Sequence, residues 1–495
     1  WVTTHKVVLS GIFDKGTYEY RIGRDNDETY YSSIYEFTVH DNADISSFSF
    51  IQETDQQGFN WAEYQAWKRS AYFIDKNEDN YDFTINTGDE TQNGNRENEW
   101  IDYFDGRYLI DGKEEMFTIG NNDLCGHDAT VLTNGNDATS KYNHINVLRY
   151  FTFEIDVNNS PEFVWNNVTY PIYSLYSFNY GVYHFISLNS ETAIASSKTY
   201  IGYEDDSNPG DATYAQACNA AIEDWFKKDL QIWKGIQSDP TGCSKAIVYM
   251  HENPFTIVTW QYMSGSSERA GSHLNTLDSR GLYRFSRLFK KYGIRLVMGG
   301  HKHTYAITKP IYDAPAGYIK SDHTIDSTVD LMNTIDAPSS RVPVIQITDP
   351  SYIPSSDDNA RYELVTKIDA PVYVTSQATG YKLVSNKELP SGNDYTIPWL
   401  FSYFKALSNS TSPTVNAAQY YPTYIRYDLS ATEIKITSKQ IYGIWNVDIH
   451  ANKESYNMNN QISDLNATPM TLSQISDADK TAYGITDNTT YTIEL

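Results

Sequence analysis

The chain has 495 residues, and its 63 acidic and 38 basic residues give a formal net charge of −25, which argues against a nucleic-acid-binding protein because contacts to phosphates require a basic surface. Aromatic residues make up 14% of the chain, too many for a disordered protein. No apolar run approaches the roughly 18 to 20 residues of a membrane-spanning helix, so the composition predicts a globular protein with ample material for a core.

The first 45 residues contain three runs in which apolar and polar residues alternate. This period predicts antiparallel strands at 6–12, 17–23 and 33–39. A complete β-sandwich needs about 100 residues. We therefore interpret residues 1–45 as a partial β-sandwich that precedes a larger domain.

From residue 46 onward, short apolar strands alternate with helical stretches. The expected strands and helices, with the polar residues that follow each strand, are strand 48–55, helix 60–74, strands 81–89 and 115–123, helix 220–233, strand 245–254, helix 281–294 and strand 295–303. Repeated β-α-β order predicts a largely parallel, layered α/β fold, which we extend to residue 445. Ligands of such sheets bind at the carboxyl ends of the strands.

The last part of this domain returns to strands. These are expected at 342–348, 371–377, 423–430 and 432–443, the last two as a hairpin. Residues 446–495 are rich in Asn, Ser and Thr with weak periodicity, which predicts a loosely structured C-terminal extension.

Side chains that commonly bind metals follow five of the expected strands. They are Asp55 with Gln57, Asp89, Asn121, His251, and His301 with His303. The set mixes carboxylates, amides and imidazoles, which suits two divalent or trivalent ions bridged by one carboxylate. Each cluster alone is weak evidence, because Gly-Asp and Gly-Asn pairs are common in turns. Five such clusters in order, each directly after a strand, favour a metal centre.

The sequence around these residues resembles that of the calcineurin-like metallophosphoesterase superfamily, and within it most of all the purple acid phosphatases. The matching motifs are ETDQQ (53–57), TGDETQNG (87–94), GNND (120–123), MHENP (250–254) and GGHKHTY (299–305). The resemblance implies a core of β-sheets flanked by helices. It also implies that the N-terminal strands are the end of a fibronectin-like domain.

The resemblance further implies a role for each candidate ligand. Asp55, His303 and Gln57 would hold a first metal, Asp89 would bridge both metals, and Asn121, His251 and His301 would hold the second. Iron, manganese or zinc would be the ions. The expected reaction is hydrolysis of a phosphate mono- or diester by a metal-bridging hydroxide.

Three positions depart from the pattern of the purple enzymes. Gln92 replaces a Tyr that binds ferric iron, so a tyrosinate-to-iron colour is not expected. Asn122 replaces a His that protonates the leaving group, a step worth about 10²–10⁴-fold in rate. Gln57 stands where many relatives have His, but it still offers a carbonyl oxygen. These departures leave a reduced activity open.

Two further histidines are candidates to replace the missing acid. His127 lies five residues after Asn122, and His273 lies before helix 281–294, in a region that borders the substrate in relatives. The alternative interpretation of each is an ordinary loop histidine.

A second interpretation of the chain is a catalytically weakened metallophosphatase fold that serves as a structural or binding module. The charge and the C-terminal extension suit a component of a surface or particle assembly, with partners bound through the extension. For the chain under either interpretation, we favour an extracellular, cell-surface or particle-associated location over a cytoplasmic one. Against this interpretation, every ligand position still carries a residue able to bind metal. The enzyme is therefore the favoured interpretation.

Overall fold

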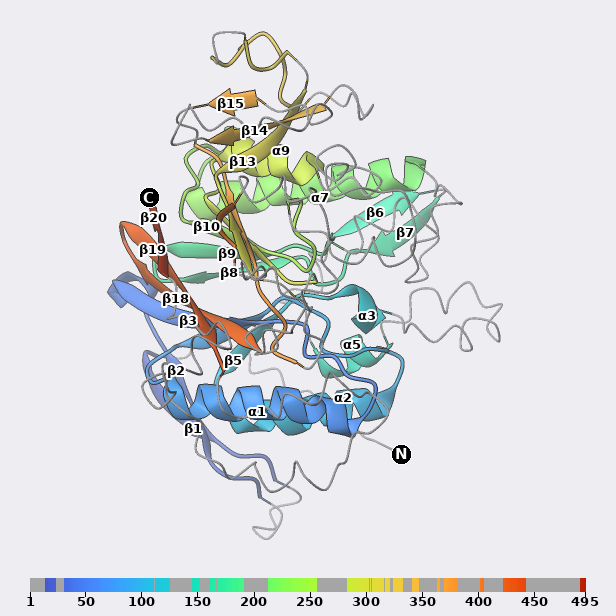
Figure 1. The fold of residues 1–495 in the computed structure, drawn as a ribbon, viewed down its shortest axis with the longest axis vertical. Coiled ribbons are helices and arrows are strands. Elements are labelled where there is room, and N and C mark those ends of the chain that lie inside the picture. The colour runs from blue at the N-terminus through green and yellow to red at the C-terminus, as the bar shows by residue number, and fades with distance from the viewer. Residues whose placement is uncertain are drawn as a thin grey trace, which may run out of the picture.

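The structure is a computed structural model of the chain (Figure 1). It describes residues 14–23, 31–110, 112–124, 145–151, 161–165, 167–190, 212–255, 283–301, 303, 305–315, 317–320, 324–332, 341–346, 363–365, 369–380, 401–404, 422–441 and 490–495. Among these residues, no helix is long and apolar enough to cross a membrane.

Two large mixed sheets form the centre of the described part of the chain. One has seven strands in the order β17 (Phe401–Phe404), β12 (Ala306–Thr308), β16 (Val372–Thr375), β11 (Leu296–Gly299), β10 (Ala246–Tyr249), β9 (Tyr183–Ser187) and β8 (Tyr176–Tyr180). The other has six in the order β20 (Thr490–Glu494), β19 (Glu433–Gln440), β18 (Thr423–Ser430), β3 (Ser47–Glu53), β4 (Phe83–Asn86) and β5 (Glu114–Phe117). The strands that precede the candidate ligands are parallel neighbours, β10 with β11 in one sheet and β3, β4 and β5 in the other.

The two sheets pack face to face. Successive side chains of a strand point to opposite faces of its sheet, so each strand contributes to the cluster between the sheets and to a cluster on the outer face. Phe50 and Ile247 lie in one apolar cluster between the sheets. Their neighbours Ile51 and Val248 lie in separate clusters with the helices that cover the outer faces. Helices α1 (Trp61–Asn77) and α2 (Glu97–Arg107) cover the six-stranded sheet, and α7 (Ala212–Lys234) and α9 (Tyr283–Tyr292) cover the seven-stranded one (Figure 1). This arrangement confirms the predicted α/β fold of sheets flanked by helices.

Smaller elements surround this core. They are the sheet of β13 (Ile311–Pro315), β14 (Arg341–Gln346) and β15 (Glu363–Val365), the hairpin of β6 (Glu162–Trp165) and β7 (Val168–Pro171), the short helices α3 (Asn121–Leu124) and α5 (Ile145–Tyr150), and the 3-10 turns η2 (Asn42–Asp44) and η3 (Tyr108–Ile110). A buried ion pair, Arg287 with Asp313, joins α9 to β13.

The N-terminal region contributes one antiparallel pair to the described residues, β1 (Gly16–Tyr20) with β2 (Tyr35–Val39). The expected strand 6–12 lies outside the described residues. The partial fibronectin-like sandwich and the three domain boundaries therefore stay predictions. At the other end, residues 490–494 of the expected extension form β20, which pairs with β19.

Helices α1 and α2 pack through a buried tryptophan. The Nε1 of Trp67 donates to the carbonyl of Tyr103 at 3.0 Å, and the two rings stack with centroids 5.9 Å apart. Gly106 makes this approach possible, since a Cβ there would lie 2.4 Å from Cδ1 of Trp67.

We expect Trp67→Ala to lower the free energy of unfolding by about 3–5 kcal/mol, because it removes a large buried ring and leaves a cavity. Urea denaturation followed by circular dichroism measures the change. Trp61→Ala is the matched control on the same helix, since Trp61 is exposed and should cost about 0.5 kcal/mol or less. Equal losses in the two variants would contradict this packing.

Candidate metal centre

The predicted ligands lie just beyond the carboxyl ends of five strands. Asp55 follows β3, Asp89 follows β4, and Asn121 begins α3 shortly after β5. From the facing sheet, His251 follows β10, and His301 and His303 follow β11. Because these strands are parallel neighbours within each sheet, their ends meet at a common edge, and the two edges face each other.

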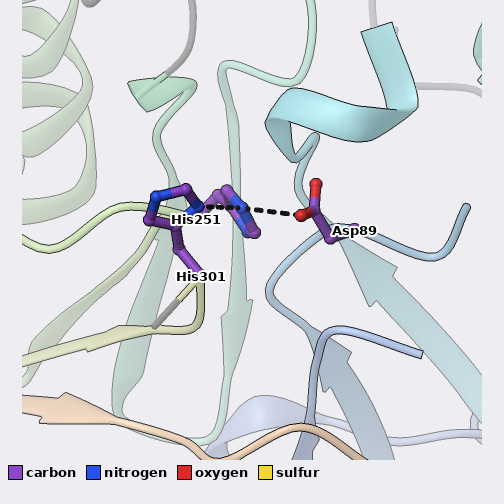
Figure 2. A group of neighbouring side chains, drawn as sticks. All are labelled: Asp89, His251 and His301. Carbon is purple, nitrogen blue, oxygen red and sulfur yellow. Dashed lines mark hydrogen bonds and ion pairs between the residues drawn. The ribbon is translucent and has the colours of Figure 1, made fainter. Parts of the chain in front are cut away.

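Among the described residues, Asp89, His251 and His301 form a group of ionisable side chains that could hold a metal ion (Figure 2). Their ligand atoms all lie within 4.8 Å of one another. Nε2 of His251 is 3.4 Å from Oδ2 of Asp89 and 3.2 Å from Nδ1 of His301. Oδ1 of Asn121 lies 3.1 Å from the same His251 nitrogen and 3.0 Å from Nδ1 of His301. We call these four residues the second metal position, after the role that the resemblance predicts for them.

The outward nitrogens of the two imidazoles fix which atoms face this centre. Nδ1 of His251 lies 2.8 Å from the carbonyl of Thr87, so it donates there and leaves the lone pair of Nε2 toward the cluster. Nε2 of His301 lies 3.4 Å from the carboxylate of Glu252, which leaves Nδ1 toward the cluster. Two imidazole nitrogens, an amide oxygen and a carboxylate thus converge. Such a group of electron-pair ligands fits a cation.

Asp55, Gln57 and His303 form a further cluster that contacts Asp89 through Gln57, and we call these three, with Asp89 shared, the first metal position, after the role that the resemblance predicts for them. Oδ1 of Asp55 is 3.1 Å from Nε2 of His303, and among the described residues no donor is hydrogen-bonded to this oxygen. Oδ2 of Asp55 accepts from Thr54 Oγ1 at 2.9 Å and from the backbone N–H of His301 at 2.8 Å. Asp55 is thereby oriented with one oxygen toward His303.

The three positions that depart from the purple-phosphatase pattern contact one another. Nε2 of Gln92 donates to Oδ1 of Asn122 at 3.1 Å, and Nδ2 of Asn122 donates to Oε1 of Gln57 at 2.8 Å. Nε2 of Gln57 then donates to Oδ2 of Asp89 at 3.0 Å. All three amides are buried. The departures therefore form one hydrogen-bonded chain that ends on the central carboxylate.

Asp89 is held as a carboxylate. Burial raises the pKa of Asp89, but when Nε2 of His251 carries a proton, the charge and hydrogen bond of His251 and the hydrogen bonds from Asn122 outweigh burial and lower this pKa to about 2. Neighbouring Asp123 accepts from the backbone N–H groups of Asp89, Thr91 and Gly120, which ties the Asp89 loop to the loop before α3. Burial and the nearby charge of Asp89 raise the pKa of Asp123 to about 6.

The backbone at the site is strained. Four candidate ligands have φ in the left-handed region: Asp55 (54°), Asp89 (63°), His301 (69°) and His303 (52°). Residues with side chains rarely adopt this conformation, and such strain is concentrated at functional sites. The other three candidate ligands, Asn121, His251 and Gln57, are described residues without a positive φ.

Glycines bring the loops close together. A Cβ at Gly120 would lie 2.2 Å from Oδ1 and 2.3 Å from the backbone nitrogen of Asp89. At Gly300 it would lie 2.0 Å from Oγ1 of Thr54 and 2.6 Å from Oδ2 of Asp55. Neither position can take a side chain without displacing a candidate ligand.

Gly120→Ala should therefore weaken metal binding by about tenfold or more, the range seen when the partners that orient metal ligands are changed. Isothermal titration of the metal-free chain with Mn²⁺ measures the affinity. The control is Gly112→Ala, where no described atom would come within 4 Å of the new Cβ. An unchanged affinity in Gly120→Ala would show that Asp89 does not depend on this close contact.

Some predicted residues cannot be placed, and some contacts were not predicted. The candidate acids His127 and His273 lie outside the described residues, so their roles stay predictions.

The sequence analysis did not predict the contact of Glu252 with His301. An acidic residue directly after the expected ligand His251 was a signal that could have indicated it. The Thr87 carbonyl gives no sequence signal, because any residue type supplies one.

The sequence matches a family model, Metallophos, described as calcineurin-like phosphoesterase, over residues 39–305, a range that holds every candidate ligand named above. No curated protein matches the chain.

Several solved structures are similar to this one. A purple acid phosphatase, PPD1, from seeds of yellow lupin (Lupinus luteus) has a TM-score of 0.46 and 13% sequence identity, over 86% of this chain and 57% of that one. The chain thus spans 57% of the length of the lupin protein. PhoD has a TM-score of 0.47 and 11% identity, over 86% of this chain and 72% of that one. GAP50, the anchor in the inner membrane complex of Plasmodium, has a TM-score of 0.34 and 10% identity, over 80% of this chain and 84% of that one.

Proposed function

The chain belongs to the calcineurin-like phosphoesterase family, and on that premise we propose that it hydrolyses phosphate mono- or diesters at the centre around Asp89. The observation that carries the proposal is the convergence of carboxylate, amide and imidazole ligands from the ends of five strands in two facing sheets. A fold alone does not define a reaction, so the argument depends on these side chains.

The ligands divide into two positions that share Asp89. Asp55 and His303 would hold one cation, and Asn121, His251 and His301 the other. Gln57, which the sequence also predicts as a ligand, lies between Asp89 and His303 with its NH₂ group toward them. When bound, two cations of iron, manganese or zinc would supply charge neutralisation for the phosphoryl oxygens and an acidified water as the nucleophile.

The chain's own residues do the positioning. Thr87 and Glu252 hold the two imidazoles with the required nitrogens inward. Asp123 fixes the loop that carries Asp89 through backbone N–H groups. This preorganisation matters because cation-binding geometry that is set in advance costs no rearrangement during the reaction.

Proton donation to the leaving group is the weak step of the proposed reaction. Asn122 has no titratable proton, and its amide is engaged with Gln57 and Gln92. The chain is therefore proposed to act best on esters with weakly basic leaving groups.

Hydrolysis of p-nitrophenyl phosphate and bis(p-nitrophenyl) phosphate by the full chain tests the proposal. We expect hydrolysis with added Mn²⁺ or Zn²⁺, its loss after dialysis against a chelator, and its return when the metal is restored. Asp224→Asn, at an exposed site on α7, should behave as the native chain does. If neither ester is hydrolysed while metal is bound, the hydrolase proposal fails and a binding role is favoured.

A further inference from the structure

Gln57 occupies the space between Asp89 and His303. Its side chain is buried, and its Nε2 lies 3.0 Å from Oδ2 of Asp89 and 3.2 Å from Nε2 of His303. Its Oε1 accepts from Nδ2 of Asn122 at 2.8 Å. The end of Gln57 that faces the first metal position is therefore its NH₂ group.

This orientation follows from the chemistry of the neighbours. The ionised carboxylate of Asp89 can only accept hydrogen bonds, so the group that faces it must be a donor. Asn122 also turns its Nδ2 toward Oδ2 of Asp89, while its Oδ1 accepts from Gln92. Turning the Gln57 amide around would place its oxygen against the Asp89 oxygen and its nitrogen against the Asn122 nitrogen, which breaks both bonds.

The two metal positions consequently differ in what they offer. The second has the amide oxygen of Asn121 beside His251 and His301, and each of these imidazoles has an acceptor nitrogen in its neutral form. The first has acceptor atoms of Asp55 and His303, while Gln57 offers a partly positive NH₂ group in the place of a third ligand. A cation there must displace the hydrogen bond from Gln57 to Asp89 before it can share that carboxylate.

We propose that the two positions bind cations with unequal affinity, tightly at the second and weakly at the first, because the Gln57 amide stands in for a cation between Asp89 and His303. The inference deepens the proposed function and rests on its metal centre. It makes catalysis depend on the metal concentration. At low concentration a cation occupies only the second metal position, and hydrolysis rises when another cation enters the first metal position beside Gln57.

The test is a titration of the metal-free full chain with Mn²⁺, with bound and free ion measured by calorimetry and by electron paramagnetic resonance. The native chain should bind one ion tightly and another at least about 100-fold more weakly. Gln57→Glu keeps the shape of the side chain but replaces the NH₂ group with a carboxylate oxygen. It should tighten the weaker event by about tenfold or more, and leave the tighter event less changed.

Two further variants keep the result interpretable. Gln237→Glu adds the same charge at an exposed position and should leave both events unchanged. Gln57→His supplies a neutral acceptor and should also strengthen the weaker event, so the inference stays testable if the buried carboxylate prevents folding.

Two equal binding events in the native chain would overturn the inference, as would Gln57 variants that fold but leave the weaker event unchanged. Either result would leave the proposed hydrolase intact if esters are still cleaved. Conversely, unequal binding without any hydrolysis would support the inference and reject the proposed activity. Failure to bind any cation would reject both.

Discussion

Asp89→Asn is expected to lower the hydrolysis of aryl phosphates by about three orders of magnitude or more. In the proposed centre, Asp89 is the carboxylate that both metal positions share: its Oδ2 is 3.0 Å from Nε2 of Gln57 and 3.4 Å from Nε2 of His251. A neutral amide has one oxygen and no charge with which to bridge two cations. Losing several kcal/mol of electrostatic stabilisation corresponds to this change in rate.

The measurement is kcat/KM for p-nitrophenyl phosphate at saturating Mn²⁺, together with the number of ions bound. The pKa of about 2 keeps Asp89 ionised throughout the neutral range, so the loss should be the same at every pH from about 5 to 8. Because this pKa is depressed, the ionised form stabilises the fold above about pH 4, and that contribution is lost as the pH falls toward 2.

Asp224→Asn is the control, because it makes the same chemical change at an exposed position. The melting temperature shows whether the Asp89→Asn chain is folded. A folded Asp89→Asn chain that binds two ions with native affinity would contradict the bridging role, whatever its activity.

The position of the candidate ligands at the ends of strands could be predicted from the sequence because its signal is local. A run of buried apolar residues followed by Asp, Asn or His marks the end of a parallel strand, and β4 with Asp89 and β10 with His251 are examples. The partners of those ligands were not predictable in the same way. The Thr87 carbonyl and the Gln57–Asn122 amide pair meet only when the loops are brought together in the fold.

Helix α2 was missed because its buried face is partly charged. Its buried residues include Glu99 and Arg107 beside Trp100 and Tyr103, so the apolar period of a helix is broken. Glu99 accepts from the backbone N–H groups of Gln92 and Asn93, and Arg107 pairs with Glu115. Tertiary contacts satisfy these charges, and such contacts outweigh a local hydrophobic pattern.

Strand β20 was missed for a different reason. It is five residues long, and Ile493 is its buried residue. The strand it joins, β19, ends at residue 440, so nearly fifty residues separate the partners. Pairing over such a distance leaves no local signal, because the alternation of so short a segment also occurs by chance.

The second large effect concerns Asn122. If the chain acts without a strong general acid, aryl esters should be hydrolysed far faster than alkyl esters, because a phenolate leaves without protonation and an alkoxide does not. Asn122→His places a titratable group within the amide chain that reaches Asp89. It should raise alkyl turnover about 10²–10⁴-fold while changing aryl turnover little.

The control is Asn122→Gln, which keeps an amide and should not accelerate alkyl hydrolysis. A pH profile separates acid catalysis from a change in shape: the gain in Asn122→His should fall as the pH rises through the imidazole pKa, about 6.5 in an unperturbed histidine. Fast alkyl hydrolysis by the native chain would mean that another acid, such as His127 or His273, already serves. A gain that is equal for both esters and constant with pH would mean that the imidazole repositions Asp89 through Gln57, because only proton donation distinguishes the two leaving groups.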